Sequence, residues 1–293
     1  MSKFENLSYE ILQLRPNQIL VYTYYPDARR GGARNQHSIN YLLPENTKYT
    51  GLLSASARKK LRYAINLLVA QAEWKTALNF QLQKNFKFRV NFVTLTLSAP
   101  QGAISDKEIK RVCLNNFLNR AKKLWNMNTY VWRAEKQRNT NIHFHITTDV
   151  YIHYQELCKV WNECQELLGF VTRYRERTGN INPNSTDVHS VKDVRNLANY
   201  LVKYMSKKEK DAQVIDGKVW GCSKNLLKAK KYETELYGDD LSSFNKLCEM
   251  FPGDLFENEH CAILTLPEND FYKHVPDRWI VEYRKYLDSV HDN

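Results

Sequence analysis

The sequence lacks the features that mark several common protein classes. No apolar run is long enough to cross a bilayer, and the first residues, MSKFENLSYE, lack the charged-then-apolar order of a signal peptide. We therefore expect no membrane partner and a cytoplasmic location, in the host cell if the protein is viral. The six cysteines have no CxxC spacing, which argues against a zinc knuckle and favours reduced, mostly buried thiols.

A phosphate-binding loop is also missing, because the pattern GxxxxGK[ST] does not occur in the chain. This absence argues against a built-in helicase motor. The 293 residues do include a 43% hydrophobic share, which is enough for a real core, and they carry a net charge of +11.

Acidic residues are scarce in most of the chain and gather near its end. Residues 1–232 hold 38 Lys and Arg against 18 Asp and Glu, whereas residues 233–293 hold 5 against 14. A basic body favours a phosphate-rich partner, because side chains that neutralise phosphates release counterions. The acidic segment either covers that basic surface or is simply a solvated face, and the sequence leaves both readings open.

Two histidines stand one residue apart in a stretch with strand character, His143-Phe144-His145. Alternate side chains of a strand point to one face, so both imidazoles project together while Phe144 turns to the other face. Such a pair also occurs by chance, with one ring solvated and the other hydrogen-bonded. The pattern therefore needs partners before it indicates a metal site.

A third ligand is available if the histidines lie in a hairpin. The polar segment 138–140 predicts a loop between strands at 129–137 and 141–148, and a three-residue loop places Glu135 opposite His143 on the same face. Two imidazoles and a carboxylate leave positions open on a divalent cation and suit Mn²⁺, Mg²⁺ or Zn²⁺. The spacing does not choose among them.

Two stripes of side chains follow residue 193 at helical spacing. Tyrosines four apart often only pack on each other above a fringe of solvated lysines, so this pattern alone would indicate a structural helix. The apolar stripe is Ala198, Leu201, Val202 and Met205, and the polar stripe is Tyr200, Lys203, Tyr204 and Lys207.

Taken in order, FVTLTLS, His-hydrophobe-His and Tyr-x-x-Lys-Tyr-x-x-Lys resemble the three motifs of HUH endonucleases. More specifically, the chain resembles rolling-circle replication initiators of the two-tyrosine type found in single-stranded DNA phages, over residues 90–232. The resemblance implies that His143 and His145 bind a divalent metal, Mg²⁺ or Mn²⁺, with Glu135 as third ligand. It also implies that Tyr200 and Tyr204 are nucleophiles that form a 5′-phosphotyrosine and free a 3′-OH. Lys203 and Lys207 would stabilise a phenolate or hold phosphate.

The expected fold class is α+β, with a split βαβ, or ferredoxin-like, antiparallel sheet and helices on one face. Ser105-x-x-Glu108 resembles a capping box. The expected strands are 90–98, 129–137, 141–148, 170–174 and 187–191; the expected helices are 54–83, one from Ser105 to about Trp125 with Ile109, Val112, Phe117, Ala121 and Leu124 buried, 154–168, and the tyrosine helix, which Asp193 can cap.

Three ranges organise the expected domains. Residues 1–89 form a basic, partly helical DNA-binding extension, residues 90–232 the nickase core, and residues 233–293 an acidic extension without an assigned role. The expected partners are single-stranded DNA or an origin hairpin, with a separate helicase and polymerase. Two alternatives remain: a single-strand-binding module without catalysis, in which aromatic and basic side chains grip DNA, and a relaxase or transposase with the same chemistry.

Overall fold

The structure is a computed structural model that describes residues 9–24, 51–79, 83–191, 201–203, 205, 213–229 and 231–291. By its internal contacts the chain forms two compact units. We call Tyr49–Lys228 the central unit, and Met1–Lys48 together with Ala229–Asn293 the terminal unit.

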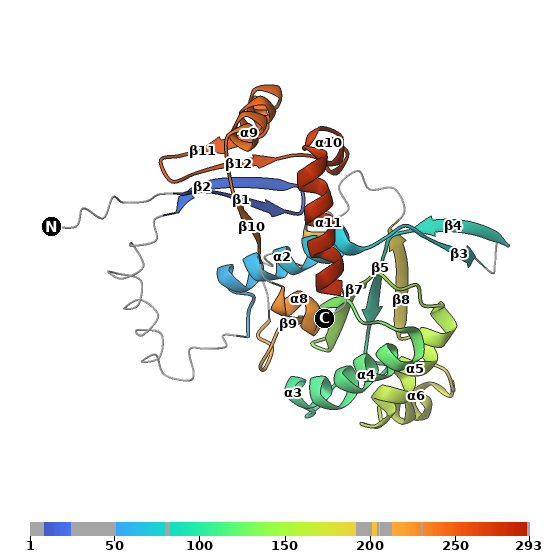
Figure 1. The fold of residues 1–293 in the computed structure, drawn as a ribbon. Coiled ribbons are helices and arrows are strands. Elements are labelled where there is room, and N and C mark those ends of the chain that lie inside the picture. Colours follow the sequence, from blue (N-terminus) through green and yellow to red (C-terminus); the bar gives the residue numbers. More distant parts are fainter. Residues whose placement is uncertain are drawn as a thin grey trace, which may run out of the picture. The chain divides into compact units, whose positions relative to one another are not determined.

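The central unit is built on a five-stranded antiparallel sheet with the strand order β8-β5-β7-β6-β9 (Figure 1). Strand β7 lies between β5 and β6, so the unit β5-helix-β6 is split by a strand of opposite direction, as the sequence predicted. The α+β class and the antiparallel sheet are thereby confirmed. The strands are β5 (Val90–Leu95), β6 (Tyr130–Lys136), β7 (Ile142–Thr148), β8 (Thr186–Val191) and β9 (Trp220–Cys222).

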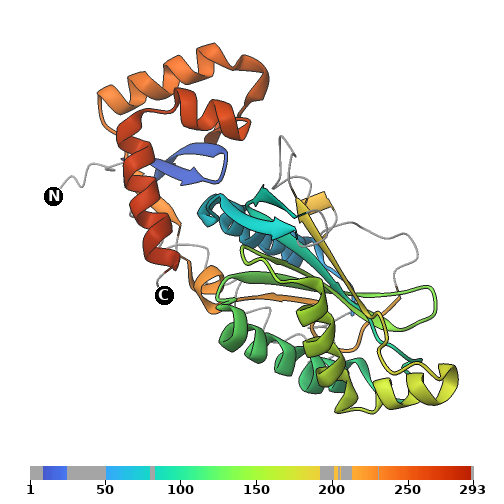
Figure 2. The same cartoon turned by 90° about the vertical axis from the view of Figure 1, so that its right-hand side faces the viewer.

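One face of this sheet packs on helices. Val93, Leu95 and Phe144 are fully buried or nearly so and belong to a core that includes Phe117 and Trp161 from the covering helices. Figure 2 shows these helices, in green, on one side of the sheet and the blue α2 on the other. The helices are α3 (Asp106–Ile109), η3 (Lys110–Leu114), α4 (Asn115–Trp125), α5 (Tyr154–Glu166) and α6 (Phe170–Thr178).

The opposite face is covered in part by α2 (Ala55–Gln71), which lies against β6 and β9. Ser54 caps this helix, because its hydroxyl accepts a hydrogen bond from the backbone N–H of Ala57 at 3.1 Å. The short helix α8 (Lys224–Lys228) also contacts α2. The covered part of the sheet lies beside Val131, which is fully buried, and leaves the part around the histidines half-buried.

The predicted helix over 54–83 is wrong beyond Gln71, where a separate two-stranded ribbon begins. Its strands are β3 (Lys75–Asn79) and β4 (Lys84–Phe88), and Figure 1 shows the ribbon projecting from the central sheet. An aromatic contact anchors its base, since the rings of Phe86 and Tyr151 meet edge to face with centroids 5.5 Å apart. Sequence periodicity missed the turn between helix and ribbon, which only this tertiary contact rewards.

The predicted strand at 170–174 is also wrong, because the segment is α6. Gly169 adopts φ +70°, which ends α5 and lets the chain turn directly into the next helix. The carboxylate of Glu166 then accepts the backbone N–H of Thr172 at 2.9 Å, a capping interaction that a strand would not need.

Leu124 is 56% exposed, although the helical pattern predicted it as buried. The helix contains a π turn at Lys110–Leu114, which inserts one residue and rotates the buried face. Cys113 and Leu114 become core residues, while Val112 is only partly buried. Ser105 caps the start as predicted, with its hydroxyl accepting the N–H of Glu108 at 3.1 Å.

The terminal unit contains a second five-stranded antiparallel sheet, in the order β10-β1-β2-β12-β11. Strands from both ends of the chain therefore share one sheet. The strands are β1 (Tyr9–Arg15), β2 (Gln18–Tyr24), β10 (Tyr232–Glu235), β11 (Leu255–Glu257) and β12 (Cys261–Thr265), and the helices are α9 (Asp239–Met250), η4 (Pro252–Asp254), α10 (Glu268–His274) and α11 (Asp277–His291).

The structure groups the chain differently from the three predicted ranges. Residues 51–79 and 83–89 belong with the central sheet, whereas 9–24 pair with strands after residue 229. The roles assigned to 1–89, 90–232 and 233–293 stay predictions.

All six cysteines are free, and two of them, Cys113 and Cys164, are buried. Across the described ranges, none of the helices combines the length and apolarity required to traverse a bilayer.

Candidate metal centre

The β6–β7 hairpin has the predicted register, with Glu135 directly opposite His143. Its loop is closed by two backbone hydrogen bonds, from Gln137 N–H to Asn141 O and from Thr140 N–H to Gln137 O, both 2.9 Å. Thr140 adopts φ +69°, the left-handed position that a three-residue hairpin loop requires. The loop length that the sequence suggested is what brings the carboxylate level with the imidazole.

The three predicted ligands converge on the face of the sheet away from α4 and α5. Glu135 Oε2 lies 3.3 Å from His145 Nε2 and 3.5 Å from His143 Nε2. One ligand atom from each residue lies within 4.8 Å of the others. Donors that each sit about 2.1 Å from a shared ion are about 3.0–3.4 Å apart, so this spacing fits a divalent cation.

The imidazole of His145 is held in place by its neighbours on β5. Its Nδ1 lies 3.1 Å from the hydroxyl of Thr94, and its ring stacks on Phe92 with centroids 5.2 Å apart. A histidine that binds metal commonly uses its second nitrogen in such a bond, which fixes the tautomer and the ring orientation. Nε2, the nitrogen that faces Glu135, is then the one left for an ion.

His143 differs from His145 because both of its ring nitrogens are buried without a hydrogen bond in the part of the chain that the structure describes. The 3.5 Å separation from Glu135 is too long for a hydrogen bond. Buried polar atoms are almost always satisfied, so an unpaired imidazole in this position favours a role as a metal ligand. The donor set therefore fits a divalent cation on an observation independent of spacing.

Glu135 is held ionised by its surroundings. Burial alone would raise the pKa of this carboxyl, but the imidazoles of His143 and His145 and the guanidinium of Arg133 bring the pKa far below its ordinary value. Arg133 Nη1 lies 2.8 Å from Glu135 Oε1, and the two side chains are only 7% and 13% exposed. The carboxylate thus enters the site with its full charge.

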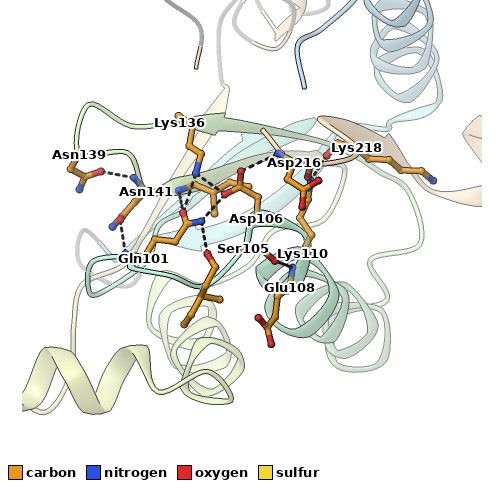
Figure 3. Close-up of polar contacts among 12 residues, drawn as sticks. Gln101, Ser105, Asp106, Glu108, Lys110, Lys136, Asn139, Asn141, Asp216 and Lys218 are labelled. Carbon is orange, nitrogen blue, oxygen red and sulfur yellow. Dashed lines mark hydrogen bonds and ion pairs between the residues drawn. The ribbon is translucent and has the colours of Figure 1, made fainter. Parts of the chain in front are cut away.

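A polar network fixes the open end of the same hairpin (Figure 3). Asp106 Oδ1 accepts from Lys136 Nζ at 2.6 Å and from Gln101 Nε2 at 2.7 Å, while Asp106 Oδ2 accepts the backbone N–H of Asp216 at 3.1 Å. Asn141, at the end of the loop, accepts the backbone N–H of Gln101 at 2.8 Å. Lys136 follows Glu135 directly, so the network holds the strand that carries the carboxylate ligand.

The same network ties down the described chain that follows the tyrosine motif. Lys110 Nζ donates to the backbone oxygen of Lys218 at 2.8 Å and also to that of Asp216. Ile215, 4% exposed, belongs to the core of the central unit. The stretch from Ile215 to Lys218 is therefore fixed against the elements that hold the metal hairpin.

Tyr200, Tyr204 and Lys207 lie outside the described residues, as do Ala198 and Asp193. Lys203 is described: it is helical and exposed, and no described contact links it to the ligand cluster. Leu201, Val202 and Met205 are buried, which agrees with the apolar stripe predicted for this helix. The roles of the two tyrosines and two lysines stay predictions.

Sequence reasoning missed Arg133, Thr94 and the Asp106–Lys136 pair. Strand alternation could have found Arg133, since it lies two residues before Glu135 and opposite His145. Thr94 sits in a generic apolar strand, and its partner His145 depends on the pairing of β5 with β7. Asp106 and Lys136 are 30 residues apart, and no local pattern links them.

Comparison with known proteins relates this site to a described family. Residues 90–209, which span β5 to β8 and the tyrosine motif, match the model of a family of replication-associated proteins of the ORF2 type. No match was found among curated proteins or among solved structures. The matched stretch contains all three ligand residues, Glu135, His143 and His145, so the chain is similar to replication-associated proteins in the region that carries the metal centre.

Proposed function

We propose that the protein is a replication initiator that nicks single-stranded origin DNA through tyrosine attack and later rejoins the displaced strand. The observation that carries the proposal is the convergence of Glu135, His143 and His145 on one sheet face, inside a stretch similar to replication-associated proteins. The basic charge of the central unit supports the same partner, since it holds 30 Lys and Arg against 14 Asp and Glu.

Glu135, His143 and His145 would hold Mg²⁺ or Mn²⁺, whose chemistry when bound is Lewis-acid polarisation of a non-bridging phosphate oxygen. Thr94 keeps the His145 ring turned so that Nε2 is available, and Arg133 keeps one oxygen of Glu135 turned toward both imidazoles. The site is therefore preorganised, which is where such electrostatic catalysis obtains its advantage.

Tyr204 or Tyr200 is the proposed nucleophile. Its phenolic oxygen forms a bond to phosphorus, the bond from phosphorus to the 3′ oxygen breaks, and the phenolic proton ends on that 3′ oxygen. The products are a 5′-phosphotyrosine and a 3′-OH that primes a polymerase. One phosphodiester replaces another, so the reaction needs no nucleotide and can run backwards to join strands.

Two tyrosines one helical turn apart allow a second cleavage while the first is still esterified. Lys203 and Lys207 share their spacing and would favour the phenolate, because the pKa of a free tyrosine is about 10. A separate helicase is expected to supply the single strand. The described β3–β4 ribbon, with Lys84 and Lys87 exposed, replaces the predicted helix as the element of residues 1–89 offered to duplex DNA.

The test uses a labelled origin oligonucleotide, as single strand and as hairpin, with Mn²⁺ or with a chelator. The unsubstituted protein should form a covalent adduct only with metal. Tyr200→Phe and Tyr204→Phe should each retain part of the adduct, and the double variant should form none. Tyr154→Phe, at a tyrosine 48% exposed on α5, is the matched control and should behave as wild type.

The same assay separates the alternative of a binding module without catalysis. Such a module would bind DNA equally well in the presence of a chelator and would leave the label uncut. An adduct that persists in the doubly substituted protein would instead move the nucleophile to another residue.

A further inference from the structure

The two oxygens of the Glu135 carboxylate have different partners. Oε1 lies 2.8 Å from Arg133 Nη1, whereas Oε2 faces the Nε2 atoms of both histidines at 3.3 and 3.5 Å. A carboxylate that used both oxygens on one ion would have to release the guanidinium. Arg133 is 7% exposed along its side chain, so that release would leave a buried charge without its partner.

Arg133 also changes the charge of the donor set. Two neutral imidazoles contribute nothing, and the single negative charge of Glu135 is matched by the permanently protonated guanidinium beside it. The four side chains thus sum to zero. In cation sites the number of anionic ligands tunes affinity, and a divalent ion on a neutral set keeps most of its own charge.

We propose that Arg133 is a positioning residue that makes metal binding and DNA phosphate binding cooperative. It fixes Glu135 as a one-oxygen ligand and leaves the bound ion with a charge that a phosphate oxygen completes. This inference rests on the proposed metal-dependent nickase and adds to it that DNA is part of the metal site's charge balance.

Thermodynamic linkage makes the effect reciprocal. If DNA tightens the metal by some factor, then the metal tightens DNA by the same factor, and coupling of this kind is typically about 5- to 150-fold. Burial keeps the interaction between Arg133 and the site from being screened as a surface charge would be.

The experiment measures Mn²⁺ binding by electron paramagnetic resonance on the full chain, with and without a single-stranded oligodeoxynucleotide. The proteins carry Tyr200→Phe and Tyr204→Phe so that the DNA stays intact. The parent should bind Mn²⁺ weakly alone and at least about fivefold more tightly with DNA. Arg133→Gln keeps a donor for Glu135 Oε1 but removes the charge, so it should bind Mn²⁺ alone about tenfold more tightly and lose most of the DNA effect.

Two further variants keep the test sharp. Arg133→Lys retains the charge and should keep the coupling of the parent, whereas Arg138→Gln, in the exposed hairpin loop, removes a charge outside the site and should change nothing. If Arg133→Gln weakens Mn²⁺ binding in the absence of DNA, or leaves the coupling intact, the inference is overturned. If the parent binds no Mn²⁺ under either condition, the metal centre itself is overturned, and the proposed function with it.

Discussion

The chain contains two five-stranded antiparallel sheets that differ in almost everything except their architecture. The sheet of the central unit carries Glu135, His143 and His145 on one face, and its unit has a net charge of +16, from 30 basic and 14 acidic side chains. The sheet of the terminal unit belongs to a unit with 13 basic and 18 acidic side chains, a net of −5.

One glutamate from each sheet makes the contrast more specific. In the terminal unit the exposed Glu233 accepts hydrogen bonds from Gln13 and, at 3.2 Å, from Tyr22, so neutral donors surround it. In the central unit the half-buried Glu135 meets two imidazoles and a guanidinium. Among the described residues, the central cluster is the one group of three such side chains close enough to share an ion. Similar sheets therefore differ in function through a few side chains.

The largest expected effect comes from removing the charge of the central glutamate. Glu135→Gln removes the anionic ligand, so Mn²⁺ binding should weaken on the order of 100-fold or more and metal-dependent nicking should disappear. Glu233→Gln is the matched control in the other sheet and should leave both unchanged. Isothermal titration and the adduct assay measure the two effects, and equal losses in both variants would contradict the assignment.

The next effect concerns the ion pair that holds the metal hairpin. Lys136 and Asp106 are 12% and 7% exposed, so Asp106→Asn leaves a buried ammonium without its partner and should lower the free energy of unfolding by about 3 kcal/mol. The matched control in the terminal unit is Glu282→Gln, whose pair with Lys285 is more than half exposed and should contribute under about 0.5 kcal/mol. Urea unfolding compares the two variants, and a similar small loss in both would sink the argument.

The same pair predicts how stability depends on pH. Burial would raise the pKa of Asp106, but hydrogen bonds from Lys136, Gln101 and the N–H of Asp216 lower it below its ordinary value. A group with a lowered folded pKa stabilises the fold above its unfolded pKa of about 4 and loses this contribution as pH falls through the folded value. Stability should therefore drop in acid more steeply for the parent than for Asp106→Asn. Parallel curves between pH 3 and 5, on the order of the ordinary carboxyl range, would contradict the prediction.

A smaller effect should distinguish the basic unit from the acidic one in DNA binding. Lys84→Gln with Lys87→Gln removes two exposed charges from the ribbon and should lower the salt dependence of hairpin binding by about two phosphate contacts. The matched pair in the terminal unit, Lys246→Gln with Lys273→Gln, should leave that slope unchanged. Fluorescence anisotropy over a range of salt concentrations measures both. The ribbon assignment fails if the two double variants have the same slope.

The smallest expected effect is a gain in stability at the hairpin loop. Thr140 is β-branched and exposed at φ +69°, a conformation that asparagine tolerates better. Thr140→Asn should therefore raise the free energy of unfolding of the central unit by about 0.5–1 kcal/mol, as measured by urea unfolding. Arg138→Asn, in the same loop but without a positive φ, should bring no gain.

Local patterns located most of the central elements. Alternation placed Val93, Leu95 and Leu97 in the core, and all three are at most 7% exposed. The hairpin register and the grouping of Glu135 with the two histidines followed from strand geometry and loop length, because both depend on residues close in sequence. The antiparallel split βαβ order followed from the sequence of predicted elements, even though one predicted strand proved to be a helix.

The sequence by itself determined the spacing of the ligands, since a two-residue period and a three-residue loop fix which side chains share a face. Only the tertiary structure decided what surrounds them. Thr94 reaches His145 through the pairing of β5 with β7, Asp106 reaches Lys136 across 30 residues, and the strands of the terminal sheet come from both ends of the chain. Such contacts depend on how distant segments pack, and no local period encodes that packing.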